Sequence, residues 1–177
     1  MALLELKNLK TFFATKRGTV KAVNGVSYSL DAGKVLGVVG ESGSGKSVSA
    51  MSILRLLDGN GYIDSGEILF NGQDLTKLSM NEMYKIRGNE ISVIFQEPMT
   101  SLNPVYTIGA QMVEMLQTHQ KISNHDAMQK SIEMLEKVGI PSPEQRIKEY
   151  PHQLSGGMSQ RVMIAMALAL SLIHISE

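Results

Sequence analysis

One stretch decides the fold of this chain: Gly40-Glu41-Ser42-Gly43-Ser44-Gly45-Lys46-Ser47. It fits the phosphate-loop pattern G-x-x-x-x-G-K-[ST]. The apolar, β-branched run Val35–Val39 precedes it and predicts a buried strand. The residues that follow predict a helix with one apolar stripe over Ser47–Leu57. The glycines are therefore expected between the end of a strand and the start of a helix.

The chemistry of this loop suits a polyphosphate. Gly43 and Gly45 can take backbone angles closed to other residues, and they lack a Cβ that would hold an anion away. Successive N–H groups can point inward as a nest, and the helix start adds unpaired donors and a positive dipole end. Lys46 would reach the β- and γ-phosphates, and the Ser47 hydroxyl would ligate Mg²⁺. The alternative is a Gly/Ser turn with a surface lysine. The predicted nucleotide-binding residues here are Gly40, Glu41, Ser42, Gly43, Ser44, Gly45, Lys46, Ser47 and Val48.

The composition is that of one globular domain. The chain has 177 residues, 43% of them hydrophobic, which is enough to bury a core. Lys+Arg 17 against Asp+Glu 17 leaves no net charge, so nothing in the composition points to a nucleic acid. The absence of cysteine excludes disulfides and thiolate metal sites. The longest nearly apolar run, Val162–Ile173, is short of the ~20 residues that a membrane span needs, so we expect a soluble chain.

The beginning of the chain predicts strands joined by a short turn. Met1–Leu30 is expected to form strands, with a hairpin turn at Lys16-Arg17-Gly18-Thr19. Phe12 and Phe13 lie just before this turn. An aromatic side chain at this place could stack on an adenine ring, or it could be an ordinary strand residue.

The middle of the chain alternates strands with connections. Asp58–Ser65 is a polar, glycine-rich connection, and Gly66–Phe70 predicts a strand that ends in a tight turn at Asn71-Gly72. A short helix is expected over Thr76–Gly88. Ile91–Phe95 predicts another buried strand, which ends before the proline three residues later because proline cannot continue a ladder.

From Met99 onward helical spacing replaces the strand signals. Ser123 followed by Asp126 resembles a capping box, which begins a helix. Gly139 followed by Pro141 ends this helix. The many methionines on the apolar faces are interpreted as core residues, with an adaptable docking surface as the alternative. The two apolar faces comprise Ile108, Met112, Met115 and Leu116, and then Met128, Ile132, Leu135 and Val138.

A second glycine turn opens a helix further along the chain. Ser155-Gly156-Gly157 precedes a segment rich in Ala, Met and Leu, for which a helix is expected from Gln160 to about Leu170. A second helix start able to bind an anion therefore occurs in the same chain. Alone, Ser-Gly-Gly also makes linkers, but beside a phosphate loop it indicates a second phosphate contact.

Together these motifs resemble the ATP-binding cassette (ABC) ATPases, collinearly from Met1 to about Leu170. The resemblance depends on three motifs: the phosphate loop, Ile94-Phe95-Gln96-Glu97-Pro98 as the Q-loop, and Leu154-Ser155-Gly156-Gly157-Met158 as the signature. Met158 stands where the family usually has Gln. Residues 96–104 and Tyr150-Pro151-His152 are similar to the oligopeptide/dipeptide importer branch, to which nickel importers are close.

The resemblance implies an α/β fold: a P-loop NTPase with a RecA-like core, an antiparallel β subdomain and an α-helical subdomain, incomplete at the C-terminus. We divide the chain into residues 1–98 (nucleotide-binding core with the β subdomain and phosphate loop), 99–154 (helical subdomain) and 155–177 (signature and its helix). Family members follow this helix with an apolar strand ending in Asp-Glu. The tail Ser171–Glu177 does not resemble that strand, and we expect a truncated or frame-shifted fragment.

This departure has two expected consequences. In the family's parallel sheet the phosphate-loop strand and the Q-loop strand are separated by strands that this chain lacks. Their backbone groups would then be unpaired, so we expect a marginally stable or aggregation-prone chain. The family's Asp supports Mg²⁺ and its Glu polarises water, so we also expect no turnover from the chain as given.

The resemblance also implies a mechanism. Two such subunits, identical or similar, would face head to tail, with each ATP and its Mg²⁺ between the phosphate loop of one and Ser155, Gly156 and Gly157 of the other. Gln96 would help to hold Mg²⁺ and position the attacking water, and Phe13 would stack on the adenine. Lys46 and Gln96 are thus the predicted catalytic residues, and Ser47 and Gln96 the predicted metal ligands.

The implied function is ATP-driven import of dipeptides or oligopeptides through membrane permease subunits. The subunit would lie peripherally on the cytoplasmic face of the membrane, with an extracytoplasmic peptide-binding protein as an indirect partner and no nucleic acid. Alternatives are a soluble ABC ATPase of DNA repair or translation, an unrelated phosphate-loop GTPase or kinase, and an ATP-binding fragment without turnover.

Overall fold

The computed structural model of the chain describes residues 2–95 and 101–171. These residues form two compact units, Met1–Met83 and Tyr84–Glu177, and each is described by itself. The division into residues 1–98, 99–154 and 155–177 stays a prediction. Among the described residues, no helix is long and apolar enough to cross a membrane.

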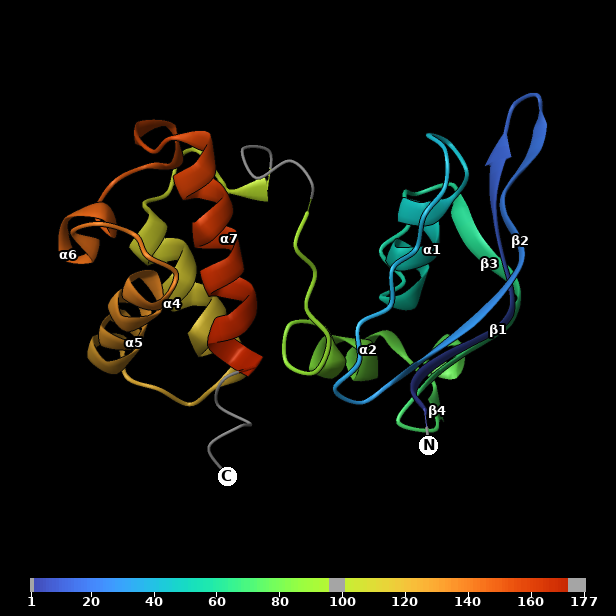
Figure 1. Cartoon of the computed structure of the whole chain (residues 1–177), viewed down its shortest axis with the longest axis horizontal. Helices are drawn as coiled ribbons and strands as arrows, with labels where there is room; N and C mark the ends of the chain where they lie inside the picture. The colour runs from blue at the N-terminus through green and yellow to red at the C-terminus, as the bar shows by residue number, and fades with distance from the viewer. Residues whose placement is uncertain (1, 96–100, 172–177) are drawn as a thin grey trace. The chain divides into compact units, whose positions relative to one another are not determined.

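The first unit is built on a four-stranded antiparallel sheet. Its strands are β1 (Ala2–Thr15), β2 (Gly18–Asp31), β3 (Gly61–Phe70) and β4 (Gln73–Asp74), in the order β2-β1-β3-β4 (Figure 1). The hairpin turn predicted around residues 16–19 is confirmed, because Thr15 pairs with Gly18. The turn predicted at residues 71–72 is confirmed as well. Asn71 and Gly72 have φ of 49° and 80°, as the primed turns of two-residue hairpins require.

β3 begins five residues earlier than predicted. The segment Asp58–Ser65 was expected to be a connection, but its second half continues the strand, with Phe13 opposite Gly61 and Thr11 opposite Ile63 on β1. Pairing with a long neighbour favours this extension, because each added residue satisfies backbone groups that would otherwise need water, and Tyr62 and Ile63 are residue types that favour strands.

Helix α1 (Lys46–Ile53) follows the phosphate loop, as predicted, but it is shorter than the expected Ser47–Leu57. Arg55 has φ of 52°, a left-handed conformation that stops a helix. The buried residues of α1 are Ser49 and Ser52, so its inner face is polar. Leu54, just beyond the helix, supplies the buried apolar contact.

The predicted strands Val35–Val39 and Ile91–Phe95 are wrong. Neither segment is a strand, and near the second only the isolated bridge between Arg87 and Ile91 forms. Val35 and Val39 are 99% and 93% exposed. A strand is stable only when a neighbour takes its N–H and C=O groups, and apart from that bridge neither segment has such a neighbour within residues 2–95 and 101–171.

The helix predicted over Thr76–Gly88 is confirmed as two short pieces. These are the 3₁₀ turn η1 (Leu75–Lys77) and the helix α2 (Met80–Ile86). Asp74 caps η1 by accepting a hydrogen bond from the Thr76 N–H, which fixes the chain direction after the sheet.

The second unit is helical. Its elements are α4 (Ile108–His119), α5 (Asn124–Lys137), α6 (Pro143–Arg146), the 3₁₀ turn η2 (Pro151–Gln153) and α7 (Gly156–Ser171). Helices α4, α5 and α7 pack against one another around one apolar core (Figure 1). That core includes Ile108, Met112, Leu116, Leu135, Val162 and Leu170.

The helical predictions are largely confirmed. Ser123 caps α5 by accepting a hydrogen bond from the Asp126 N–H at 3.1 Å, and Gly139 follows the helix with φ of 73°. The methionines of both faces lie in the core or pack against it, as the core interpretation required. Helix α7 begins at Gly156 rather than Gln160, because Ser155 supplies its cap.

Candidate functional site

The phosphate loop lies directly before α1 in the first unit (Figure 1). Gly43 and Gly45 have φ of 79° and 90°, and Gly45 is the N-cap of α1. A Cβ on Gly45 would collide with the backbone carbonyl of Ala22 on β2. A Cβ on Gly40 would come within 2.7 Å of the Ser44 hydroxyl. Backbone conformation therefore favours glycine at positions 43 and 45, and close approach of the Ala22 carbonyl also requires it at 45. At Gly40 the close atom is a side-chain oxygen, which can rotate away.

Lys46 is folded over this loop. Its Nζ donates hydrogen bonds to the carbonyl oxygens of Gly40 and Glu41, each at 2.6 Å. The ammonium group is thus held at the loop by two neutral acceptors. An anion bound in the loop would offer charged acceptors instead, and charge-assisted hydrogen bonds are about twice as strong as neutral ones.

The donors around the loop fit a magnesium–nucleotide complex. The first amides of α1 have no partner within the helix, so they can donate to an anion. The hydroxyl of Ser47 is an exposed hard oxygen of the kind that Mg²⁺ prefers. Among the described residues, no group of three or more His, Cys, Asp or Glu side chains could hold a metal by itself. A metal here would therefore rely on the ligand's phosphates and water as well.

Two hydroxyl contacts attach α1 to the sheet. Thr11 Oγ1 on β1 lies 2.8 Å from Ser52 Oγ, and Tyr28 OH on β2 lies 3.3 Å from Ser49 Oγ. Sequence reasoning missed these residues, because it looked for an apolar stripe on this helix. The i,i+3 spacing of Ser49 and Ser52, which places both on one face, was the signal that could have identified them.

Of the two aromatic residues before the hairpin turn, Phe12 has a structural role. It is 8% exposed, packs edge-to-face on Tyr62 and lies under the Lys21 ammonium. Phe13 is half-buried and packs near Gly61. Base stacking by Phe13 stays a prediction, and Phe13 is the better placed of the two because Phe12 is already covered.

The signature segment caps α7 in the second unit. Ser155 accepts hydrogen bonds from the Met158 N–H through its hydroxyl and from the Ser159 N–H through its carbonyl. Gly156 and Gly157 are exposed, and a Cβ on either would meet no atom within 4 Å. Among the described residues of this unit, no packing contact requires them to be glycine. Met158 packs against the helical core.

Gln96 lies outside the residues that the structure describes, so its predicted role stays a prediction. The phosphate loop and the signature belong to different units, and each directly precedes a helix of its own unit.

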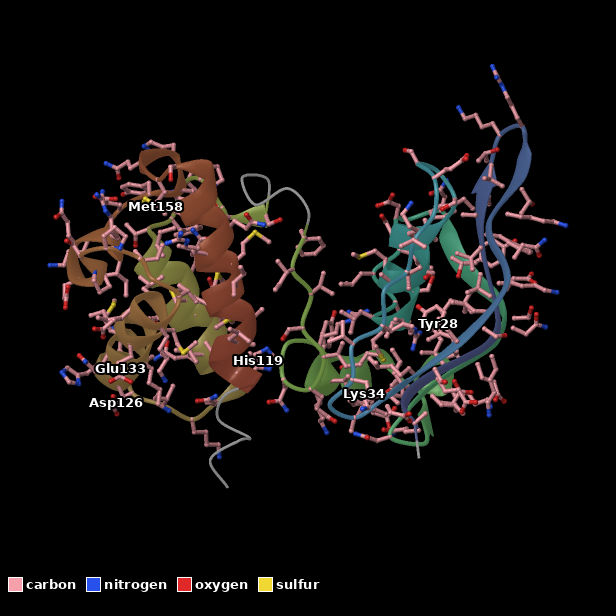
Figure 2. All side chains as sticks on the ribbon, in the orientation of Figure 1. Tyr28, Lys34, His119, Asp126, Glu133 and Met158 are labelled. Carbon is pink, nitrogen blue, oxygen red and sulfur yellow. The ribbon has the colours of Figure 1, made fainter. Side chains whose placement is uncertain are left out.

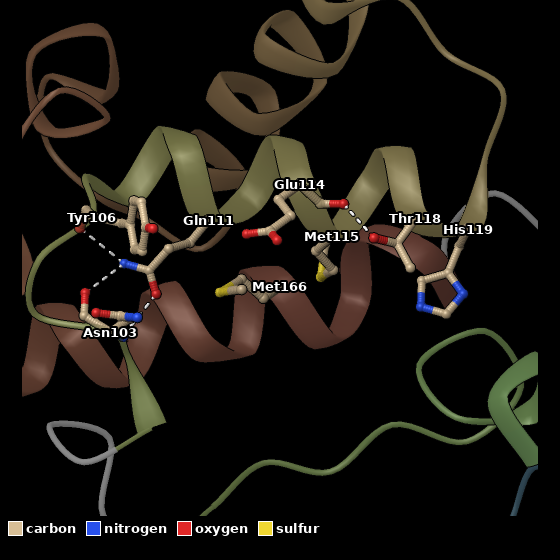
Figure 3. A pocket seen from close by; sticks show the side chains of 8 residues that line it. All are labelled: Asn103, Tyr106, Gln111, Glu114, Met115, Thr118, His119 and Met166. Atoms are coloured by element: carbon tan, nitrogen blue, oxygen red, sulfur yellow. Dashed lines mark hydrogen bonds between the residues drawn. The ribbon is translucent and has the colours of Figure 1, made fainter. Parts of the chain in front are cut away.

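The second unit also has an open pocket of about 430 Å³ between α4 and α7 (Figure 3). Gln111 holds one rim, because its Nε2 donates to the carbonyls of Asn103 and Tyr106, each at 3.0 Å. No residue of the phosphate loop or of the signature lines it. The lining residues are Asn103, Tyr106, Gln111, Glu114, Met115, Thr118, His119 and Met166.

The chain is similar to proteins of a known family. The profile of the family described as ABC transporter matches residues 23–172. The chain is 54% identical over 168 residues to the oligopeptide transport ATP-binding protein OppD of Bacillus subtilis (strain 168), covering 94% of this chain and 47% of that protein. It is 50% identical over 169 residues to the dipeptide transport ATP-binding protein DppD of Escherichia coli (strain K12), covering 96% and 52%. The chain therefore spans about half the length of the curated relatives it matches.

The structure is also similar to solved cassettes. It matches the ABC transporter cassette MJ0796 with a TM-score of 0.83 and 27% identity, covering 95% of this chain and 70% of that one. MJ0796 was solved as a dimer and, in a second structure, in a post-hydrolysis state bound to ADP and Pi. The predicted α/β cassette fold is confirmed, and the chain belongs to the ABC transporter family.

Proposed function

We propose that this chain is the nucleotide-binding part of an ATPase subunit that powers the import of dipeptides or oligopeptides through a membrane permease. One observation carries the proposal: a loop of positive-φ glycines precedes a helix, with the Lys46 ammonium held over it by two carbonyls. The relatives OppD and DppD, which are named for oligopeptide and dipeptide transport, support the choice of cargo.

Lys46 would act by exchanging partners. When a triphosphate enters the loop, the Lys46 Nζ would leave the Gly40 and Glu41 carbonyls and donate to the β- and γ-phosphate oxygens instead. The loop amides and Ser47 would hold the phosphates and Mg²⁺, which neutralises charge on the transferred phosphoryl group. The reaction is phosphoryl transfer to water, catalysed by positioning and electrostatics. Gln96 would orient the water, and Phe13 would stack on the base.

Ser155, Gly156 and Gly157 would contact the γ-phosphate of ATP bound to a second subunit. The Ser155 hydroxyl accepts from its own helix, so its proton can be donated outward. The open space in front of the two glycines supports an approach by another molecule. The dimeric state of MJ0796 supports pairing of two subunits. The resemblance to the family implies that the two, identical or similar, face head to tail.

The membrane partners follow from the same proposal. The subunit would bind permease subunits at the cytoplasmic face of the membrane, and closure on ATP would drive alternating access in them. An extracytoplasmic peptide-binding protein would deliver the cargo. A soluble ABC ATPase without a transport role is the alternative, and co-purification of the full-length protein with a membrane permease separates the two.

Substitution of Lys46 tests the first step. The Lys46→Ala change removes the cation that two loop carbonyls hold at the site, so ATP affinity should fall by at least about tenfold, as for loss of a charged hydrogen bond. The measurement is titration with a fluorescent ATP analogue in the presence of Mg²⁺, at a temperature where circular dichroism shows both proteins folded.

Lys34→Ala is the matched control, since Lys34 is an exposed lysine six residues before the loop (Figure 2). The affinity of the Lys34→Ala variant for the ATP analogue should equal that of the unmodified chain. An unchanged affinity in Lys46→Ala would refute the phosphate-loop assignment.

We also expect ATP binding without turnover from the 177-residue chain, because no Asp-Glu pair follows its signature. Turnover that depends on Lys46 would contradict this.

A further inference from the structure

We propose that four hydroxyl groups, those of Thr11, Tyr28, Ser49 and Ser52, form a latch that sets the position of α1 and so presents the phosphate loop to its ligand. The proposal rests on the proposed function, and it adds positioning residues that do not themselves touch phosphate. We call these four residues the hydroxyl latch.

The direction of the buried hydrogen bond can be deduced from proton counting. Ser52 Oγ donates its single proton to the carbonyl of Val48 at 2.6 Å. It must therefore accept at its other contact, so Thr11 Oγ1 is the donor across the 2.8 Å gap. Thr11 and Ser52 are both fully buried. If one hydroxyl is removed, no water can take its place as a hydrogen-bond partner of the other.

Thr11 is a firm anchor for this bond. It lies on β1, the strand paired on both sides, opposite Val23 of β2 and Ile63 of β3. The second contact, from Tyr28 to Ser49, attaches the preceding turn of α1 to β2. The latch thus connects one face of the helix to two different strands.

Within α1 itself, only the two serines are buried against the sheet. Leu54 and the hydrogen bonds from Arg55 to the carbonyls of Leu75 and Leu78 lie beyond the C-terminal end of the helix. Apolar contacts are non-directional, so they would tolerate a slide or rotation that hydrogen bonds do not. The latch is therefore better suited to fixing a position than to adding stability.

The geometry connects the latch to the loop. Ser49 N–H donates to the carbonyl of Gly45 at 2.8 Å, and Gly45 abuts the Ala22 carbonyl, so the loop cannot move independently of the first turn of α1. The helix is about 12 Å long, and a tilt of about 5° about its far end would move the loop by about 1 Å. A displacement of that size is enough to spoil hydrogen bonds to phosphate.

Thr11→Val removes the donor but keeps the β-branched shape, and Thr11→Ser keeps the donor. We expect Thr11→Val and Ser52→Ala each to weaken binding of a fluorescent ATP analogue by about 3- to 10-fold, and the double variant to be no weaker than the worse single one. Thr11→Ser should restore affinity to within about twofold. The rate of backbone amide hydrogen exchange over residues 45–53, measured without nucleotide, should rise in Thr11→Val. In Thr11→Ser it should equal the rate of the unmodified chain.

Ser131→Ala is the matched control. Ser131 is equally buried, and its hydroxyl donates to the Ala127 carbonyl one turn back at 2.7 Å, but it lies in α5 of the other unit. This variant should lose stability without losing ATP affinity, which separates positioning from a general effect on folding. All titrations are made at a temperature where circular dichroism shows each variant folded.

The outcomes distinguish the latch from the proposed function. If the unmodified chain binds ATP and Lys46→Ala does not, equal affinity in Thr11→Val and the unmodified chain overturns the latch alone. A loss of affinity in Ser131→Ala as large as in Thr11→Val also overturns it. If the unmodified chain fails to bind ATP, the proposed function and the latch's role in it both fail. Unchanged exchange over residues 45–53 in Thr11→Val would then show that the hydroxyls do not hold α1.

Discussion

At the scale of single residues, the two glycine turns have different reasons to be glycine. Gly45 is required by the chain itself, because its φ of 90° and the Ala22 carbonyl leave no place for a Cβ. Gly157 is not required by the described structure, since a Cβ there would meet nothing within 4 Å. Folding explains the first glycine, and for the second we propose a contact with another subunit.

This difference predicts opposite effects of the same substitution. Gly45→Ala should lower the free energy of unfolding by about 1–3 kcal/mol, because a non-glycine residue is strained at this φ. Gly157→Ala should leave it unchanged or raise it by up to about 1 kcal/mol, because alanine favours the helical conformation that α7 already has. Urea unfolding followed by circular dichroism measures both.

The functional readout should separate the two variants in the full-length protein. Gly157→Ala should impair ATP-driven association of two subunits while remaining stably folded. A stability loss in Gly157→Ala comparable to that of Gly45→Ala would contradict an outward-facing role for this glycine.

At the scale of elements, the junction between β4 and η1 is held by one carboxylate. Asp74 Oδ1 accepts from the N–H and the hydroxyl of Thr76 at 3.0 and 2.8 Å, and the Lys77 ammonium lies 2.8 Å from Oδ2. Burial, the largest single influence, raises the pKa of Asp74, but the hydrogen bonds from Lys77, Thr76 and Ile68 together outweigh it and lower the pKa below its usual value of 3.8.

A lowered pKa gives a pH dependence of defined sign. The folded chain holds Asp74 ionised more strongly than the unfolded chain does, so this contribution to stability is present above about pH 4 and is lost as the pH falls through the lower folded pKa. Asp74→Asn should therefore unfold more easily than the unmodified chain at pH 7, and the difference should shrink toward pH 3. Urea unfolding across that range measures it.

Asp58→Asn is the control for this series, since Asp58 is an exposed aspartate of the same unit. The free energy of unfolding of this variant at pH 7 should equal that of the unmodified chain, because the side chain is exposed. A difference between Asp74→Asn and the unmodified chain that stays constant from pH 7 to pH 3 would show that hydrogen-bond geometry, and not charge, is what Asp74 contributes.

At the scale of the whole molecule, the chain exposes apolar segments, and it spans about half the length of the curated relatives it matches. Val35 and Val39 are almost fully exposed, and Ile94 and Phe95 are 48% and 43% exposed. Extended apolar segments without a strand partner favour association with other chains. The expected marginal stability or aggregation of the isolated chain is consistent with this surface.

Replacement of two valines tests that expectation. The double substitution Val35→Lys and Val39→Lys places charges on side chains that are 99% and 93% exposed, so it should reduce aggregation without lowering the thermal midpoint. Light scattering and circular dichroism during heating measure the two effects. Leu54→Lys, at a site that is 3% exposed, should instead unfold the first unit. A sharp two-state melt of the unmodified chain, free of scattering, would contradict the expected marginal behaviour.

Local sequence by itself determined the turns, caps and helical faces of this protein. The turn at Asn71-Gly72, the Ser123 cap and the phosphate loop each depend on what a few neighbouring residues can do with their own backbone, so their patterns can be recognised in any context. The family motifs are local in the same sense.

Only the tertiary structure decided which apolar runs became strands and what held α1. Val35–Val39 has the sequence of a buried strand, but a strand needs a partner for its backbone groups, and no described segment supplies one. Conversely, residues 61–65, which were expected to be part of a connection, joined β3 because β1 lay alongside them. The hydroxyl latch likewise connects residues 41 positions apart. Pairing across such separations depends on the whole fold, which no short pattern encodes.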